Sequence, residues 1–321
     1  MNSMNNQRHY MIRALFLLVC FGPFSQGIFA QEYSPSLYTA IRNGELKEVK
    51  ILLARGTNIN VQDADGTTPL MHAVVNAEAD CVKLLLDKGA DPNHSNKAGA
   101  TALMWAVGDL KIVQLLLDKG ANVNAVSKDG SSLLRMALNL PDAMPVVKAL
   151  LAKGAEVNQA DKNGITPLMI AGFTGKLEII QLLLAKGADP KAKSKFGFTY
   201  LMAITNSTNL AAVKWALENG LEIKDKKEDL LTGPADNGAL DIVQLLLTKG
   251  AAPNVPDSLG YTPLMHAVLT EASSLALVKL LLEHGADAKV KAKDGLTALS
   301  FAKRKGWSEV IALLTKAGAT E

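Results

Sequence analysis

Residues 68–93 read TPLMHAVVNAEADCVKLLLDKGADPN and contain the signals from which the fold can be predicted. Thr68 and Pro69 are typical of a helix N-terminus, because threonine can cap the first turn and proline lacks only an N–H that this turn does not need. The helical spacing of apolar residues after Val82 predicts a second helix, and Gly89 supplies the left-handed residue that ends it. The stretch therefore predicts two short helices joined by a tight loop.

The same arrangement recurs along the chain. Its start, Thr-Pro-Leu-Met, returns at residues 166–169 and 262–265, and segments such as 63–66 and 161–164 between the units have turn chemistry. Leucine-rich runs are closed by nine glycines at intervals of 30 to 35 residues: Gly56, Gly89, Gly120, Gly154, Gly187, Gly220, Gly250, Gly285 and Gly318. Nine consecutive units of this length predict a repeat solenoid.

Helix, tight loop, helix and glycine-containing hairpin at this period resemble the ankyrin repeat, over about residues 35 to 321. Residues 89–93 and 120–124 fit the family's Gly-Ala-Asp-Val-Asn element closely. The resemblance implies an exported, bacterial-type ankyrin-repeat protein with an all-α repeat solenoid, about nine helix-loop-helix units joined by β-hairpin-like fingers. One departure puts the hydrogen bonds of the family's Thr-Pro-Leu-His histidine in doubt, because methionine stands at its position: Met71, Met104, Met169, Met202 and Met265.

Two columns of equivalent residues indicate where the array ends. Eight residues before each closing glycine, only the first repeat has a charged residue, Glu48; three residues before it, only the last has a polar one, Thr315. An end repeat lacks a neighbour to cover one face, so we expect the first and last repeats to act as caps. The first column also contains Cys81, at a position that is otherwise mostly apolar, which favours a core residue over a reactive thiol.

Residues 1–30 are predicted to lie outside the array. Arg8 and Arg13 precede an apolar run without acidic residues, and a short segment then ends at Ala30, a pattern typical of a secretory signal peptide. The alternative is an uncleaved membrane anchor, but about eleven apolar residues fall short of the roughly twenty that a spanning helix needs. We therefore expect a signal peptide, a single repeat domain over residues 31–321 without an integral membrane segment, and a periplasmic or secreted location.

The composition and the motifs argue against several classes of function. The chain has 34 Lys+Arg against 31 Asp+Glu, a balance that argues against a specific or general nucleic-acid binder. No His-Glu-x-x-His, Gly-x-x-x-x-Gly-Lys or Gly-x-Ser-x-Gly motif occurs. His72 and His266 share a repeat position, but six repeats separate them, so they cannot bind one metal ion. We expect no enzyme activity, catalytic residue, cofactor or metal.

Candidate contact residues are found where hairpin tips depart from the average repeat. The sixth tip contains Phe196, Phe198 and Tyr200, and the eighth contains Leu259 and Tyr261. The family resemblance implies that the tips line a concave binding face, where exposed aromatic rings would anchor a partner. The alternative is that the rings fold back onto the neighbouring hairpin and seal the core.

Lysines accompany these rings. Lys191, Lys193 and Lys195 alternate along one arm of the sixth hairpin, and period-two spacing in an extended arm places them on one side. Further lysines occur in two later hairpins: Lys224, Lys226, Lys227, Lys289, Lys291 and Lys293. The pattern predicts a basic stripe that binds an acidic partner or an anionic surface; the alternative is a solvated edge that resists aggregation.

The seventh unit departs most from the repeat. Between Gly220 and Gly238 it has neither an Asp-x-x-Gly turn nor a Thr-Pro-Leu start, and Gly233 and Pro234 fall where the first helix should run. The sequence predicts a short first helix, a truncated hairpin and a soft joint near residues 221–240.

These observations favour a non-catalytic, exported scaffold that binds another protein, whose identity the sequence leaves open, and that is itself a monomer. Two alternatives stay open. One is an envelope structural or stress-protective component that binds anionic polymer or lipid. The other is an exported effector or inhibitor of an enzyme.

Overall fold

The computed structural model describes residues 35–223, 225–270 and 274–320, so the predicted signal peptide lies outside the described residues. The described residues form α-helices and no β-strand. Their β pairing is limited to three isolated antiparallel bridges. The chain divides into two compact units, residues 1–162 and 163–321, and each is described by itself. The predicted all-α repeat solenoid is confirmed.

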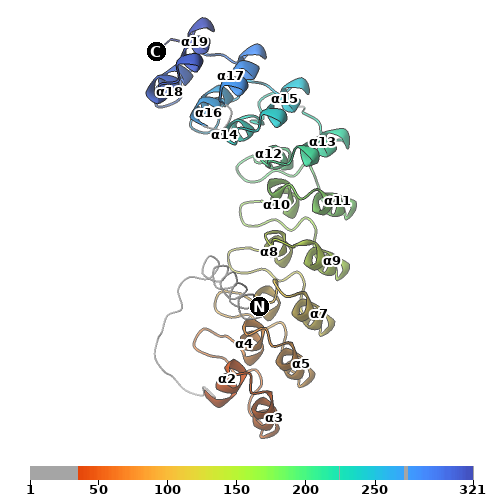
Figure 1. The fold of residues 1–321 in the computed structure, drawn as a ribbon. Helices are drawn as coiled ribbons and strands as arrows, with labels where there is room; N and C mark the ends of the chain where they lie inside the picture. The colour runs from red at the N-terminus through yellow and green to blue at the C-terminus, as the bar shows by residue number, and fades with distance from the viewer. Residues whose placement is uncertain (1–34, 224, 271–273, 321) are drawn as a thin grey trace, which may run out of the picture. The chain divides into compact units, whose positions relative to one another are not determined.

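The first unit contains four helix pairs among its described residues (Figure 1). First helices pack against first helices and second helices against second helices, which gives two layers. The helices are α2 (Pro35–Arg42), α3 (Leu46–Ala54), α4 (Pro69–Val75), α5 (Ala79–Asp87), α6 (Ala102–Trp105), α7 (Leu110–Asp118), α8 (Leu133–Leu138) and α9 (Met144–Ala152).

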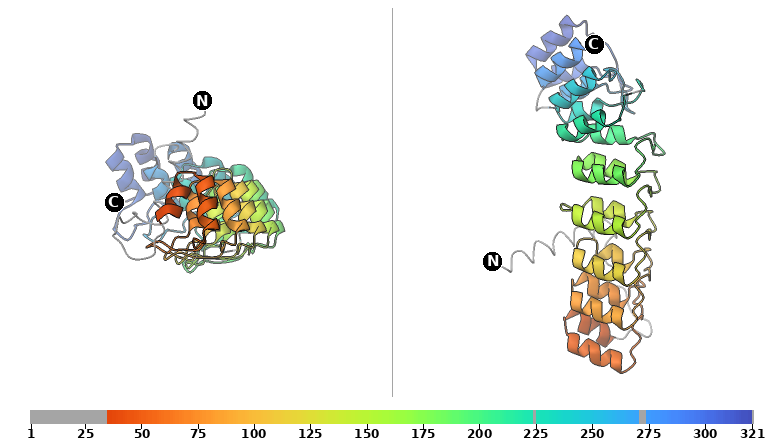
Figure 2. Two further views of the ribbon diagram at one scale, coloured as in Figure 1. Left: turned by 90° about the horizontal axis from the view of Figure 1, so that it is seen from below. Right: turned by 90° about the vertical axis from the view of Figure 1, so that its right-hand side faces the viewer.

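The second unit repeats this arrangement with five pairs, and in each unit the fingers leave the helices on one side (Figure 2). The helices are α10 (Pro167–Thr174), α11 (Leu177–Ala185), α12 (Tyr200–Thr205), α13 (Leu210–Glu218), α14 (Thr232–Asp236), α15 (Leu240–Thr248), α16 (Pro263–Leu269), α17 (Ser274–Glu283), α18 (Ala298–Lys305) and α19 (Ser308–Lys316). With at most ten residues each, the described helices are too short to cross a membrane.

The first helix of most repeats begins at a hydroxyl cap. Thr68 Oγ1 accepts a hydrogen bond from the Met71 N–H at 3.4 Å, and Pro69 follows at the first helical position. The same side-chain cap is present at Thr101, Ser132, Thr166, Thr199, Thr262 and Thr297. At the other end of each repeat, the nine closing glycines have φ between 82° and 99°, a left-handed conformation that favours glycine. Both predicted boundary signals are thus confirmed.

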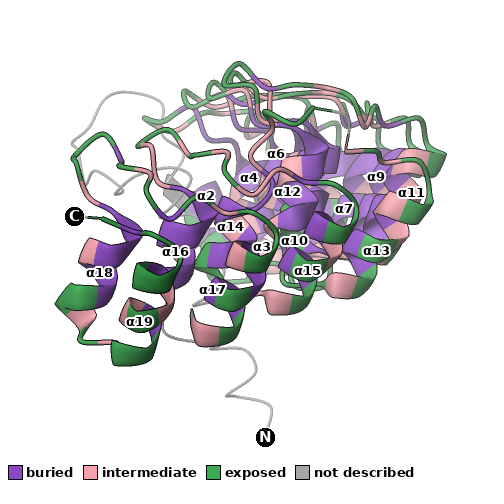
Figure 3. Cartoon of the chain, turned by 90° about the horizontal axis from the view of Figure 1, so that it is seen from above, coloured by how far each residue is buried: buried purple, intermediate pink, exposed green. Residues whose placement is uncertain are grey.

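The core lies between the two helix layers, where Figure 3 shows the buried residues. Leu85, Ile112 and Leu116 are fully buried members of it. Cys81 is also buried, and this burial, together with the nearby charge of Glu78, raises the pKa of the thiol to about 12. The burial of Cys81 confirms that it is a core residue, and the raised pKa disfavours the reactive thiolate.

Histidine holds a finger turn onto a first helix in two repeats. The buried methionines at the family's histidine position make no such bond, but the next residue does: His72 Nε2 lies 3.0 Å from Asp63 Oδ2, and His266 Nε2 lies 3.1 Å from Asp257 Oδ2. Burial alone would raise the pKa of Asp63, but hydrogen bonds from His72 and from two backbone N–H groups lower it overall. Both histidines are therefore structural.

Asparagines four residues after a closing glycine join successive fingers. Asn124 Nδ2 donates to the Gly154 oxygen at 3.1 Å, and its Oδ1 accepts from the Glu156 N–H at 2.9 Å. Asn93 and Asn254 make the same two bonds, and we call these three residues the asparagine ladder. In the sixth and seventh repeats, lysine occupies positions 191 and 224, and a lysine side chain cannot accept a hydrogen bond.

The seventh unit has the predicted short first helix, α14, although α6 of the third repeat is shorter still. Its turn closes at Glu228, eight residues after Gly220, whereas the other finger turns close ten residues after their glycine, so the hairpin is truncated. Gly233 gives Asn206 room: a Cβ there would lie 1.3 Å from Asn206 Oδ1. The soft joint near residues 221–240 lies within the second unit and stays a prediction.

Candidate functional site

The turn of the sixth finger, residues 193–199, is fixed by its own hydrogen bonds. The Ser194 N–H donates to the Phe198 oxygen at 2.9 Å, and the Gly197 N–H donates to the Ser194 oxygen at 3.0 Å. Ser194 Oγ also accepts from the N–H groups of Phe196, at 3.3 Å, and Phe198, at 3.0 Å. The turn therefore presents its side chains in a preformed geometry.

The three aromatic residues of this finger lie in three different environments. Phe196 is 81% exposed, Phe198 is half-buried, and Tyr200 is only 2% exposed. Tyr200 is buried rather than exposed at the tip, because it is the first residue of α12 and packs against Gly172 of α10. Burial raises the pKa of Tyr200, and its hydroxyl has no hydrogen-bond partner among the described residues.

The ring of Phe198 folds back onto the preceding repeat, which is the alternative to a contact with a partner. It stacks on Phe173 of α10 with a centroid distance of 4.9 Å and an interplanar angle of 5°. Phe173 itself is 46% exposed, and sequence reasoning missed it. A signal was available: the corresponding first-helix position is not aromatic in the other repeats with a hydroxyl cap, namely Val75, Gly108, Asn139, Asn206, Leu269 and Arg304.

The two candidate contact residues of the eighth finger also lie in different environments. Leu259 is 60% exposed at the tip. The Tyr261 hydroxyl donates to Asp294 Oδ2 at 2.7 Å, a bond that raises the pKa of Tyr261, and its ring meets Phe301 edge-on at 5.7 Å. Tyr261 is thus held against the ninth repeat, and Leu259 is the better placed contact residue.

The sixth-finger lysines, Lys191, Lys193 and Lys195, are exposed, and none forms an ion pair with a described residue. In the ninth finger, Lys289 and Lys291 are exposed, and Lys293 Nζ donates to the Ser258 oxygen at 2.7 Å. The charges closest to Phe196 in sequence are therefore free to meet a partner.

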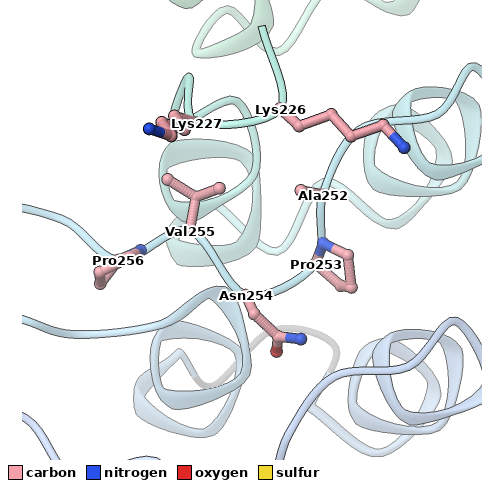
Figure 4. A pocket seen from close by; sticks show the side chains of 7 residues that line it. All are labelled: Lys226, Lys227, Ala252, Pro253, Asn254, Val255 and Pro256. Carbon is pink, nitrogen blue, oxygen red and sulfur yellow. The ribbon is translucent and has the colours of Figure 1, made fainter.

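A shallow depression of about 510 Å³ lies between the seventh finger and the segment that leads into the eighth finger (Figure 4). It is lined by Lys226, Lys227, Ala252, Pro253, Asn254, Val255 and Pro256. This depression was not predicted from the sequence, although the sequence itself shows that Ala252 departs from the repeat. The described residues contain no group of three or more His, Cys, Asp or Glu that could hold a metal ion.

The comparisons with known proteins agree with this architecture. The family described as ankyrin repeats (3 copies) matches residues 37–127, 133–227 and 232–320. A protein of Escherichia coli (strain K12) named as an ankyrin repeat protein, YahD, is 38% identical over 93 residues, which is 28% of this chain and 46% of that protein.

Two mammalian proteins are also similar. The B-cell lymphoma 3 protein homolog of Mus musculus is 38% identical over 85 residues, 26% of this chain and 18% of that protein. Cyclin-dependent kinase inhibitor 2A of Homo sapiens is 34% identical over 92 residues, 28% of this chain and 57% of that protein. The chain therefore spans less than two thirds of each of these relatives.

Proposed function

Because the chain belongs to the ankyrin-repeat family, whose repeats generally mediate protein–protein interaction, we propose that it is a non-catalytic scaffold that binds another protein through its sixth finger. The observation that carries this proposal is Phe196, 81% exposed at the tip of a turn held by four hydrogen bonds. Aromatic rings are frequent anchors at interface centres, and a preformed turn loses little entropy on binding. Exposed Lys193 and Lys195 beside the ring favour a partner with acidic groups around an apolar hollow.

The test compares two phenylalanines of one finger. Phe196→Ala is expected to weaken partner binding at least tenfold, about 1.4 kcal/mol, and to leave the unfolding midpoint nearly unchanged, because Phe196 is mostly exposed in the free protein. Phe198→Ala is the matched control; it removes the stack on Phe173 and is expected to lower the midpoint with a smaller effect on binding. The partner is captured from the native compartment, purified, and titrated against each form by calorimetry. A Phe196→Ala form that unfolds earlier but binds normally would contradict the proposal.

We also propose that the protein is exported to the periplasm or the medium. Support comes from the basic head, apolar run and Ala30 boundary of residues 1–30. Protein recovered from its native host is expected to begin at or near Gln31, which intact-mass measurement checks. A membrane fraction in which residues 1–30 are retained would overturn this expectation.

A second candidate function is a component of the envelope that binds anionic polymer or lipid, and the exposed lysines of the ninth finger, Lys289 and Lys291, favour it. Such binding should weaken steeply as salt rises, whereas binding through Phe196 and the lysines beside it should weaken less steeply. An exported inhibitor of an enzyme would use the same sixth finger. It would be identified by a captured partner whose catalytic activity falls as the complex forms.

A further inference from the structure

One hydrogen-bonding position of the repeat is left empty in the eighth unit. At the position two residues after most closing glycines, a polar side chain accepts a hydrogen bond from the backbone N–H two residues further on. Asp91 Oδ1 accepts from the Asn93 N–H at 2.8 Å, and Asp287 Oδ1 accepts from the Lys289 N–H at 2.9 Å. The same bond is made by Asn58, Asn122 and Asp189.

The eighth unit has Ala252 at this position, and alanine offers no acceptor. The corresponding backbone N–H, that of Asn254, has no hydrogen-bond partner among the described residues. Both residues line the depression described above. The residue that lacks the acceptor and the residue that has the unused donor therefore both line the depression.

The surroundings of this hollow fit an anionic group with apolar neighbours. Lys226 extends along the side of Ala252, and Lys227 lies on the side of Val255 (Figure 4). Both lysines are exposed, and neither forms an ion pair with a described residue; the Asp225 carboxylate accepts from the Lys227 backbone N–H at 2.9 Å. The remaining surface is apolar: Pro253, Val255 and Pro256.

We propose that this depression binds an aspartate or glutamate side chain on an extended segment of a protein partner. The carboxylate takes the place of the side chain that Ala252 lacks, accepts from the Asn254 N–H, and is attracted by the ammonium groups of Lys226 and Lys227. Apolar residues beside it contact Pro253 and Val255, which a polyanion without apolar groups could not do.

This site lies apart from Phe196 in sequence and rests on the proposed function only in that its ligand is part of a protein. The probe is the peptide acetyl-Leu-Asp-Leu-amide, titrated into the full ¹⁵N-labelled chain. A saturable shift of the Asn254 amide resonance is expected, whereas the uncharged peptide acetyl-Leu-Asn-Leu-amide should bind at least tenfold more weakly. Phe196→Ala should leave this binding unchanged, so failure here and failure of the sixth-finger proposal can be told apart.

Ala252→Asp supplies the missing carboxylate from the chain itself. It is expected to abolish peptide binding without lowering the unfolding midpoint, since aspartate already stands at this position in other repeats. Ser258→Asp adds the same charge to the same finger outside the depression and should leave the peptide bound. Replacement of Lys226 and Lys227 by alanine, at two exposed positions, should weaken binding at least tenfold.

Three results would overturn the proposal. The first is an Ala252→Asp form that binds the peptide as tightly as the parent chain. The second is equal affinity for the aspartate and asparagine peptides, which indicates apolar contact alone. The third is equal affinity for acetate or for dextran sulfate, which indicates a site for small carboxylates or for polyanions rather than for a protein segment.

Discussion

Gly172→Leu is expected to lower the free energy of unfolding by about 3 kcal/mol, the upper part of the usual range for overpacking. Gly172 lies in α10, where α12 packs against it. A Cβ at this position would lie 3.0 Å from the Ala203 Cβ, 3.1 Å from the Tyr200 Cδ2 and 3.2 Å from the Ile204 nitrogen. A backbone atom cannot move aside as the end of a side chain can, so the two helices must separate. Urea denaturation of the full chain measures the change.

Gly108→Leu is the matched control for this substitution. Gly108 is exposed, its φ is not positive, and a Cβ there would meet no heavy atom within 4 Å. We expect Gly108→Leu to change the free energy of unfolding of the chain by no more than about 0.5 kcal/mol. Equal stability of the two leucine forms would show that the contact between α10 and α12 does not require glycine.

Asn124→Lys is expected to lower the free energy of unfolding by about 2 kcal/mol, about 1 kcal/mol for each hydrogen bond that it removes. Asn124 both donates to Gly154 and accepts from Glu156, whereas lysine can accept nothing. Asn124→Asp keeps the acceptor and loses the donor, so it should cost about half as much. If the lysine and aspartate forms are equally stable, the bond to Glu156 contributes nothing.

The reciprocal change, Lys191→Asn, tests the break in the asparagine ladder. The parent chain should exchange its amide hydrogens fastest, among internal repeats, around residues 221–240, because the ladder lacks its asparagines at positions 191 and 224. Lys191→Asn should slow that exchange roughly tenfold, if it restores about 1.4 kcal/mol. Uniform protection across the second to the eighth repeat would refute the soft joint.

The fold could be predicted because its signals are local and repeated. A closing glycine with positive φ and a hydroxyl cap such as Thr68 act within one turn of a helix, so nine imperfect copies reveal them. Cys81 was assignable for the same reason, since its column is mostly apolar in the other repeats. The exposure of Phe196 was also predictable, because the tip of a short turn has no neighbour on its outer side.

The rest of the candidate site depends on contacts between repeats. The burial of Tyr200 follows from its position at the start of the first helix, which is buried in the other hydroxyl-capped repeats, and not from its nearness to the tip in sequence. The stack of Phe198 on Phe173 joins residues that no period relates. The depression at Ala252 was missed because it results from a side chain that is lacking, and a search for chemistry-bearing residues passes over alanine.

The preformed turn of the sixth finger has a consequence for how such a protein can change over generations. Its shape comes from Ser194 and from the backbone, including the Lys195 N–H that donates to the Asn163 oxygen of the preceding finger at 2.8 Å. The side chain of residue 196 makes none of these bonds, so a new side chain there alters what is recognised while the scaffold stays intact. A single substitution at residue 196 can thus change which partner is bound without a compensating substitution elsewhere in the chain.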